Sequence, residues 1–154
     1  MISNILHIGI TVTDLDRSIM FYRDIMGLTF QGEIVMDGPE TELLFNRPGT
    51  KARVAYLNGS SEKYAPPIEL IQFIGMEPDH QVTDLFRTSV SEICFMTDDI
   101  EADYRALTEK GVRFLSAPQH FDFSKDGFSK SKAVYFHDPD GIIIELMEPE
   151  KEIV

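Results

Sequence analysis

The chain of 154 residues is 43% hydrophobic, which suffices for one folded unit with a sizeable core or for two small halves that share one. No apolar run approaches the roughly 18 residues that a membrane-spanning helix needs, and the N-terminus lacks the basic start and apolar core of a signal peptide, so we expect a cytoplasmic protein without a membrane partner. The formal net charge of −12 argues against nucleic acid as a partner, because the average surface repels phosphate.

The first predicted element is a strand at residues 6–12, LHIGITV. Its apolar residues alternate and therefore face a core, and these residues are Leu6, Ile8, Ile10 and Val12. The same alternation places His7 on the opposite face. Asp14 is positioned to cap a helix that ends near Gly27, and another strand-like stretch follows.

Two further strands are predicted in the first half, VAYL at 54–57 and PIELIQF at 67–73. The irregular stretch 36–52 precedes them. We expect this stretch to form a long loop that leans over one end of a sheet.

The second half predicts the same order of elements. A strand begins near Val90, Asp99 caps a helix, and Gly111 ends that helix before another strand-like stretch. A second long loop is expected at 116–132. The last two strands are AVYF at 133–136 and IIELMEP at 143–149.

The two halves are copies of one pattern. The capping aspartates are 85 residues apart and the terminating glycines are 84 residues apart, so one deletion aligns them. VAYL then lies over AVYF, and PIELIQF lies over IIELMEP. The repeat predicts two βαβββ modules at about 4–74 and about 90–149, joined by a linker at about 75–89.

A duplicated βαβββ unit with these strand sequences resembles the vicinal oxygen chelate superfamily, which includes glyoxalase I, methylmalonyl-CoA epimerase, fosfomycin-resistance proteins and extradiol dioxygenases. The resemblance extends from about residue 4 to residue 149. It implies an α+β fold in which two tandem βαβββ modules form a curved mixed-sheet cup, with a divalent metal ion at the floor of the cup. Residues 1–154 would then form a single domain of this superfamily.

The resemblance also implies the metal ligands, which in this family come from the first and last strands of each module. Position by position, they are His7, Glu69, Glu92 and Glu145. Strand periodicity supports the assignment, because each glutamate shares a face with apolar neighbours. A divalent cation would offset the cost of burying several carboxylates there.

Each of these residues, taken singly, has a simpler explanation. A histidine on a strand is usually a hydrogen-bonded structural residue, and a glutamate near a strand end is usually solvated. Four such residues at positions related by an internal repeat favour a metal site instead. Glu92 departs from the family, in which histidine is commoner at that position. Without Glu92, three ligands and water would remain, which suffices for a catalytic centre.

Apolar neighbours of the ligands predict the lining of a substrate pocket. They are Ile71, Phe73, Cys94, Met96 and Met147. Cys94 is the only cysteine, so it has no internal disulfide partner, and we expect it to pack as a small apolar residue. The loop aromatics Phe121, Phe123 and Phe128 form either a lid, with Phe123 in the pocket, or the loop's own anchor to the body of the protein.

Oxygen-rich ligation suits Mn²⁺, Mg²⁺ or Fe²⁺, with Ni²⁺, Co²⁺ and Zn²⁺ as further candidates, and we expect one divalent ion per site. The predicted ligand set contains one histidine, and this counts against a ring-cleaving dioxygenase. Non-haem iron oxygenases favour two histidines and one carboxylate.

These features favour a metal-dependent lyase or isomerase of glyoxalase I type, acting on a small carbonyl or thiol-adduct substrate. The cation would stabilise an enediolate while a carboxylate moves a proton, and the resemblance makes Glu145 the first candidate for this base and Glu69 the second. The alternatives are an acyl-thioester epimerase, a ring-cleaving dioxygenase and a non-catalytic small-molecule-binding protein of the drug-resistance kind. The resemblance also implies a homodimer, with a cup formed within one chain or across two.

Overall fold

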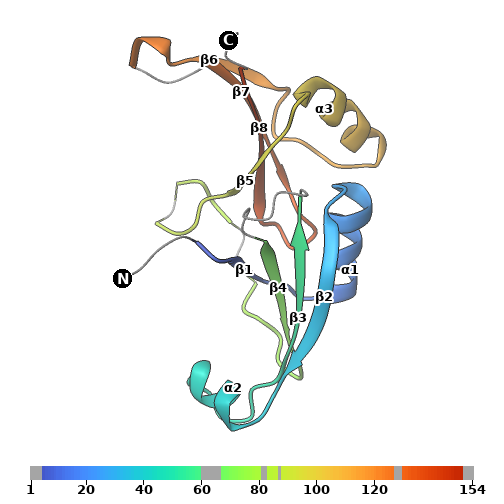
Figure 1. The fold of residues 1–154 in the computed structure, drawn as a ribbon, viewed down its shortest axis with the longest axis vertical. Coiled ribbons are helices and arrows are strands. Elements are labelled where there is room, and N and C mark those ends of the chain that lie inside the picture. Colours follow the sequence, from blue (N-terminus) through green and yellow to red (C-terminus); the bar gives the residue numbers. More distant parts are fainter. Residues whose placement is uncertain (1–4, 60–66, 81–82, 87, 127–129, 151–154) are drawn as a thin grey trace. The chain divides into compact units, whose positions relative to one another are not determined.

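The computed structural model divides into two units, residues 1–81 and residues 82–154. It describes residues 5–59, 67–80, 83–86, 88–126 and 130–150. Each unit contains one four-stranded mixed sheet with its own helices (Figure 1). The α+β class with two βαβββ-like modules, predicted from the internal repeat, is thereby confirmed.

The first sheet has the strand order β1-β4-β3-β2. β1 pairs with β4 in parallel, and the other neighbours are antiparallel. The strands are β1 (Ile8–Thr11), β2 (Thr29–Met36), β3 (Ala52–Asn58) and β4 (Ile68–Phe73), and the helices are α1 (Leu15–Met20), the π-helical turn η1 (Phe21–Ile25) and α2 (Pro39–Leu44). This order places the first and last strands of the module side by side.

The core of the first unit lies between its sheet and α1. The Asp14 side chain caps the helix by accepting a hydrogen bond of 3.0 Å from the backbone N–H of Arg17. Leu15 and Tyr22 are fully buried, and α1 packs on β3 and β4. Burying a large apolar side chain contributes about 1.5 to 3 kcal/mol, so this face holds the short helix in place.

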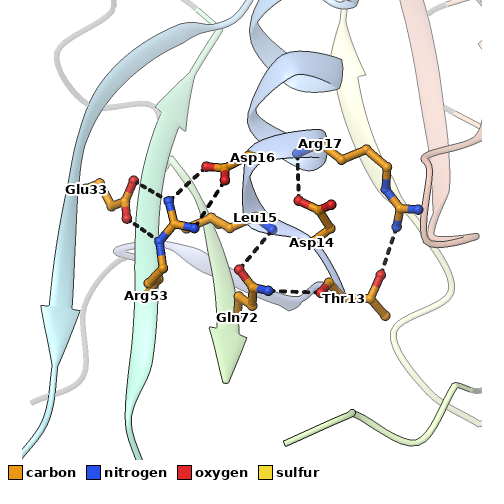
Figure 2. Close-up of polar contacts among 8 residues, drawn as sticks. All are labelled: Thr13, Asp14, Leu15, Asp16, Arg17, Glu33, Arg53 and Gln72. Carbon is orange, nitrogen blue, oxygen red and sulfur yellow. Dashed lines mark hydrogen bonds and ion pairs between the residues drawn. The ribbon is translucent and has the colours of Figure 1, made fainter. Parts of the chain in front are cut away.

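A polar cluster joins α1 to the strands of the first unit (Figure 2). Arg53 on β3 donates to Glu33 on β2 at 2.6 Å and to Asp16 on α1 at 2.8 Å. The hydrogen bond and the positive charge of Arg53 lower the pKa of Asp16, and both carboxylates raise the pKa of Arg53. One guanidinium therefore ties together three elements of this unit.

The second sheet has the order β5-β8-β7-β6, with β5 parallel to β8. Its elements are β5 (Ile93–Met96), α3 (Ile100–Glu109), β6 (Gln119–Asp122), the 3-10 helix η2 (Ser124–Asp126), β7 (Lys130–His137) and β8 (Ile143–Pro149). Asp99 caps α3 by accepting a hydrogen bond of 2.9 Å from the backbone N–H of Ala102. No helix in the described part of the chain is long and apolar enough to cross a membrane.

A matching contact in each unit joins the last strand to the start of the helix. In the first unit, the Gln72 side chain accepts a hydrogen bond of 3.2 Å from the backbone N–H of Leu15 and donates one of 3.0 Å to the Thr13 carbonyl (Figure 2). In the second unit, Glu148 accepts a hydrogen bond of 2.8 Å from the backbone N–H of Ile100. The repeat aligns Gln72 with Glu148, so the duplication extends to side-chain contacts.

The first unit differs from the prediction in two places. β1 begins only at Ile8, so Leu6 precedes the strand and is 80% exposed instead of facing the core. The stretch 36–52 is not one long loop, because it contains α2. Gly38 turns the chain with a φ of 87°, and Pro39 has the fixed φ that suits the first turn of a helix.

The second unit departs from the prediction at its second strand. The stretch after Gly111 makes only an isolated bridge between Phe114 and Phe136. Regular pairing resumes in β6, inside the stretch 116–132 that was expected to be a loop. Pro118 has no N–H to donate to a neighbouring strand, which accounts for the interruption between the bridge and β6.

Candidate metal centre

Glu69 is the middle of a row of residues that crosses three strands of the first sheet. Gly9 on β1 and Tyr56 on β3 are its register partners on either side. The Tyr56 hydroxyl donates a hydrogen bond of 2.6 Å to Glu69 Oε1, and His7 Nε2 lies 3.2 Å from Glu69 Oε2. The structure therefore brings together the predicted pair His7 and Glu69, and adds Tyr56 to it.

Gly9 leaves the space that the Glu69 carboxylate occupies. A Cβ atom at position 9 would lie 3.3 Å from Glu69 Oε2 and 3.6 Å from Ile71 Cδ1. A larger side chain would press on the carboxylate oxygen that faces His7. Gly9 is not among the glycines with positive φ, so its backbone conformation does not require glycine. The close approach of the Glu69 carboxylate does.

The Tyr56 hydroxyl stays protonated beside Glu69. Its hydrogen bond to Glu69, its burial and the charge of Glu69 raise the pKa of Tyr56 to about 12. The phenol is therefore a hydrogen-bond donor to the carboxylate throughout the neutral range. The His7 side chain is 39% exposed, compared with 12% for Glu69, so the imidazole remains open to a further partner.

The second sheet repeats this row around Glu145. Cys94 on β5 and Tyr135 on β7 are the register partners of Glu145 on β8. They take the places that Gly9 and Tyr56 have beside Glu69. Glu145 is only 7% exposed, which is unusual for a carboxylate. A small residue, a glutamate and a tyrosine thus form a row in each unit.

Negative charge concentrates around Glu145. Desolvation, followed by a hydrogen bond with Glu145 and its charge, raises the pKa of the Cys94 thiol to about 12. Desolvation and the charges of Glu145 and Glu92 raise the pKa of Tyr135. In the described part of the second unit, no lysine or arginine forms an ion pair with Glu145. The carboxylates of Glu92 and Glu145 therefore suit a divalent cation, which would neutralise their charges.

The four predicted ligands are divided equally between the units. His7 and Glu69 belong to the first unit, and Glu92 and Glu145 belong to the second. Neither unit, in its described residues, holds three or more histidine, cysteine, aspartate or glutamate side chains placed to bind a metal ion. The complete ligand set therefore stays a prediction, of which each unit supplies one half.

The predicted pocket residues keep the strand positions expected for them. Ile71 and Phe73 follow Glu69 at intervals of two along β4, and Met96 pairs with Met147 across β5 and β8. Cys94 and Met96 are exposed, whereas Ile71, Phe73 and Met147 are half-buried. Phe123 follows β6, where its ring stacks on Phe121 with centroids 5.7 Å apart. Phe128 lies outside the described residues, and the choice between lid and anchor stays open.

The sequence prediction missed Tyr56 and Tyr135, the tyrosines of the two rows, because strand periodicity does not identify them. Periodicity assigns residues to a face, but it does not say which residue lies opposite which on the next strand. The internal repeat supplies the missing signal, because it aligns Tyr56 with Tyr135 as it aligns Glu69 with Glu145.

Residues 4–146 match the family model described as the Glyoxalase/Bleomycin resistance protein/Dioxygenase superfamily. The chain belongs to this superfamily. The match confirms the resemblance on which the prediction of two modules and their ligands was based. The superfamily includes enzymes and resistance proteins, so membership does not assign a reaction, and the residues of the site have to indicate it.

Two relatives match this chain over most of its length. The uncharacterized protein YaeR of Escherichia coli strain K12 is 30% identical over 142 residues, which cover 92% of this chain and 93% of the relative. The mitochondrial methylmalonyl-CoA epimerase of the mouse is 24% identical over 143 residues, which cover 91% of this chain and 70% of the relative. The second relative is an enzyme by its name.

Solved structures of the superfamily share the fold. A glyoxalase family protein of Bacillus cereus superposes with a TM-score of 0.81 at 20% identity, covering 97% of this chain and 95% of its own. The trypanothione-dependent glyoxalase I of Leishmania major superposes with a TM-score of 0.64 at 25% identity, covering 95% of this chain and 86% of its own.

Proposed function

We propose that this protein is a divalent-metal-dependent lyase or isomerase of glyoxalase I type, in which a glutamate moves a proton. The observation that carries the proposal is the environment of Glu145. This carboxylate is 7% exposed and has no basic ion-pair partner in the described part of its unit, and the charges of Glu145 and Glu92 both act on Tyr135. A buried carboxylate without a counter-charge is costly unless a cation binds it.

His7, Glu69, Glu92 and Glu145 would hold the metal ion. One imidazole and three carboxylates suit Mn²⁺, Mg²⁺ or Fe²⁺, and Ni²⁺, Co²⁺ and Zn²⁺ are further candidates. Bound there, the ion would act as a Lewis acid on two adjacent oxygen atoms of a small carbonyl or thiol-adduct substrate. His7 presents an exposed imidazole beside Glu69, and Glu145 lies in the corresponding row of the other unit.

Glu145 is the proposed base. Its carboxylate would accept the proton from the carbon next to the substrate carbonyl, and would return the same proton to the neighbouring carbon, so that the reaction is an isomerisation with no external oxidant or reductant. Glu69, whose two oxygens are hydrogen-bonded to Tyr56 and paired with His7, is the second candidate.

The test combines a substrate assay with a matched pair of variants. Protein loaded with Mn²⁺ is given methylglyoxal together with glutathione or another thiol, and thioester formation is measured. Glu145→Gln should lower kcat at least about 100-fold, since the amide cannot accept the proton. Glu150→Gln, a change at an exposed carboxylate just after β8, should leave kcat unaltered. Absence of turnover with every thiol would remove the glyoxalase assignment.

An acyl-thioester epimerase is the nearest enzymatic alternative. The mouse epimerase among the relatives supports this alternative. It uses the same proton movement at a carbon beside a thioester carbonyl. Exchange of that carbon-bound hydrogen for deuterium in heavy water, with methylmalonyl-CoA as the probe, distinguishes this reaction from the glyoxalase reaction. Oxygen consumption with a catechol would identify a ring-cleaving dioxygenase instead.

A non-catalytic small-molecule-binding protein is a second candidate, which one observation favours. Both Glu69 oxygens already have partners in Tyr56 and His7, so the first unit is satisfied without a cation. In the described residues, no buried side-chain nitrogen or oxygen lacks a hydrogen-bond partner. A rise in melting temperature on adding bleomycin to EDTA-treated protein would support this candidate, and no rise would count against it.

The proposed assembly is a homodimer, as the resemblance to the family implies. Sedimentation equilibrium of the metal-loaded protein measures it directly. A mass of one chain at every concentration would contradict it.

A further inference from the structure

The two units share a feature that the proposed ligand set does not include. In each unit a tyrosine from the third strand of the module stands beside the glutamate of the fourth. Tyr56 pairs in register with Glu69, and Tyr135 pairs in register with Glu145. The sequence repeat aligns Tyr56 with Tyr135, 79 residues apart, and Glu69 with Glu145, 76 residues apart.

The contact in the first unit fixes how the carboxylate is presented. The Tyr56 hydroxyl is 2.6 Å from Glu69 Oε1, a short distance typical of a hydrogen bond to a charged acceptor. Glu69 Oε2 is left for the other side, where His7 Nε2 lies 3.2 Å away. The phenol therefore occupies one carboxylate oxygen and directs the other toward His7.

Gly9 completes this arrangement from the opposite strand. A side chain at position 9 would crowd Glu69 Oε2. The carboxylate is thus held by a hydrogen bond at Oε1, and Gly9 leaves room for Oε2 where it faces His7. In the second unit, Tyr135 occupies the equivalent place, in register with Glu145, and its pKa is raised first by burial and then by the charge of Glu145.

We propose that Tyr56 and Tyr135 are a matched pair of positioning residues that orient Glu69 and Glu145 for the divalent ion. The inference rests on the proposed metal-dependent function. Neither tyrosine is a ligand in this account. Each acts through its glutamate by holding one oxygen, so that the other is presented to the metal in one orientation.

The variants Tyr56→Phe and Tyr135→Phe test the inference, because they remove only the hydroxyl group. Loss of a partner that orients a metal ligand typically weakens metal binding about 10-fold to 100-fold, and we expect a loss in this range for each variant. Tyr104→Phe is the matched control. Tyr104 belongs to neither row and lies on α3, where its ring packs on Phe114 with centroids 4.6 Å apart.

Mn²⁺ affinity is measured by competition with a chelator, and the visible absorption of bound Co²⁺ reports on coordination geometry. The melting temperature of metal-free protein is measured in parallel. We expect Tyr56→Phe and Tyr135→Phe each to bind Mn²⁺ more weakly and to alter the Co²⁺ spectrum. Their metal-free melting temperatures should stay close to that of Tyr104→Phe, a pattern that general damage to the fold would not produce.

The outcomes separate this inference from the function on which it rests. If wild-type protein binds Mn²⁺ and either tyrosine variant binds it equally well with the same Co²⁺ spectrum, the positioning role is wrong while the metal site stands. If wild-type protein takes up neither ion, the proposed function fails and the inference fails with it.

Discussion

At the scale of single residues, the small residue opposite each glutamate tells as much about the proposed metal site as the glutamate itself does. Gly9 lies opposite Glu69, and Cys94 lies opposite Glu145. Both positions follow a predicted ligand by two residues along the chain. A large side chain at position 9 would press on the Glu69 oxygen that faces His7.

Replacing Gly9 by progressively larger residues is therefore predicted to weaken metal binding progressively. Gly9→Ala places a Cβ 3.3 Å from Glu69 Oε2, and Gly9→Val adds two methyl groups at the same place. We expect Mn²⁺ affinity to fall in the order wild type, alanine, valine, with a loss of stability of about 1 to 3 kcal/mol for the valine. Thr11→Val, two residues along the same face of β1, is the control. Equal Mn²⁺ affinity in Gly9→Val and wild type would contradict the close-approach argument.

Cys94 is predicted to react slowly although it is exposed. Its pKa is raised from 9.0 to about 12, so little thiolate is present at pH 8. In metal-free protein, Ellman's reagent should modify Cys94 at least about tenfold more slowly than an unperturbed thiol. Glu145→Gln removes the neighbouring charge and should speed the reaction. A fast reaction in wild type, unchanged by Glu145→Gln, would show that Glu145 does not control the thiol.

At the scale of elements, α1 and α3 each begin where the last strand of their module accepts a hydrogen bond from the helix. Gln72 on β4 and Glu148 on β8 both accept from the first backbone N–H of the adjacent helix. Such contacts satisfy N–H groups that the helix itself leaves without partners. They also fix the strand that carries the site relative to the helix of the same unit.

Gln72→Ala should destabilise the protein by about 1 to 2 kcal/mol, because it leaves the N–H of the fully buried Leu15 without its acceptor. Urea unfolding followed by circular dichroism measures the change. Gln31→Ala, on exposed β2, is the control and should change stability by less than about 0.5 kcal/mol. Equal stability of the two variants would show that the contact between strand and helix contributes nothing.

The ion pair of Arg53 with Asp16 predicts a pH dependence of stability. The pKa of Asp16 is lower in the folded state, so the unfolded state binds more protons in the acid range. The contribution of Asp16 is present above its unfolded pKa of about 3.9 and disappears as the pH falls through the lowered folded value.

The melting temperature of Asp16→Asn should accordingly lie below that of wild type at pH 6, and the difference should vanish near about pH 2. Asp37→Asn, at another exposed carboxylate of the same unit, controls for charge in general. A difference that persists unchanged down to the lowest pH would contradict the assignment.

The sequence predicts the elements and faces better than it predicts contacts between strands. Alternation at residues 6–12 and along β4 indicates which way His7 and Glu69 point. His7 directly precedes β1, and its Nε2 lies 3.2 Å from Glu69 Oε2. The hydrogen bond from Tyr56 depends on the register of β3 against β4, which periodicity does not encode. The interruption of the second strand of the later module lies at Pro118, between the bridge of Phe114 and the start of β6 at Gln119, and strand periodicity does not indicate it.

At the scale of the whole molecule, the chain is a duplication in which the two copies have diverged in charge. The first unit offers an imidazole and a carboxylate, and the second offers two carboxylates. Neither half, in its described residues, contains a complete metal site. The proposed ligands come from both halves, which one chain or two would supply.

This dependence predicts that metal binding stabilises the protein only when both halves are intact. A ligand present at 100 times its dissociation constant adds about 2.7 kcal/mol to the stability of the folded state. Saturating Mn²⁺ should therefore raise the melting temperature of wild type. It should have no effect on a protein that carries both His7→Ala and Glu145→Ala. An equal rise in the double variant would place the bound ion elsewhere.

The most direct test of the central claim is the metal content of untagged protein, measured by elemental analysis as purified and after titration with Mn²⁺. We predict one divalent ion per site in wild type and in Glu40→Ala, a change at an exposed carboxylate of α2. The ion should be lost in His7→Ala and in Glu145→Ala, one from each unit. No uptake by wild type, or full uptake by both site variants, would contradict the claim that the two rows supply the halves of one metal centre.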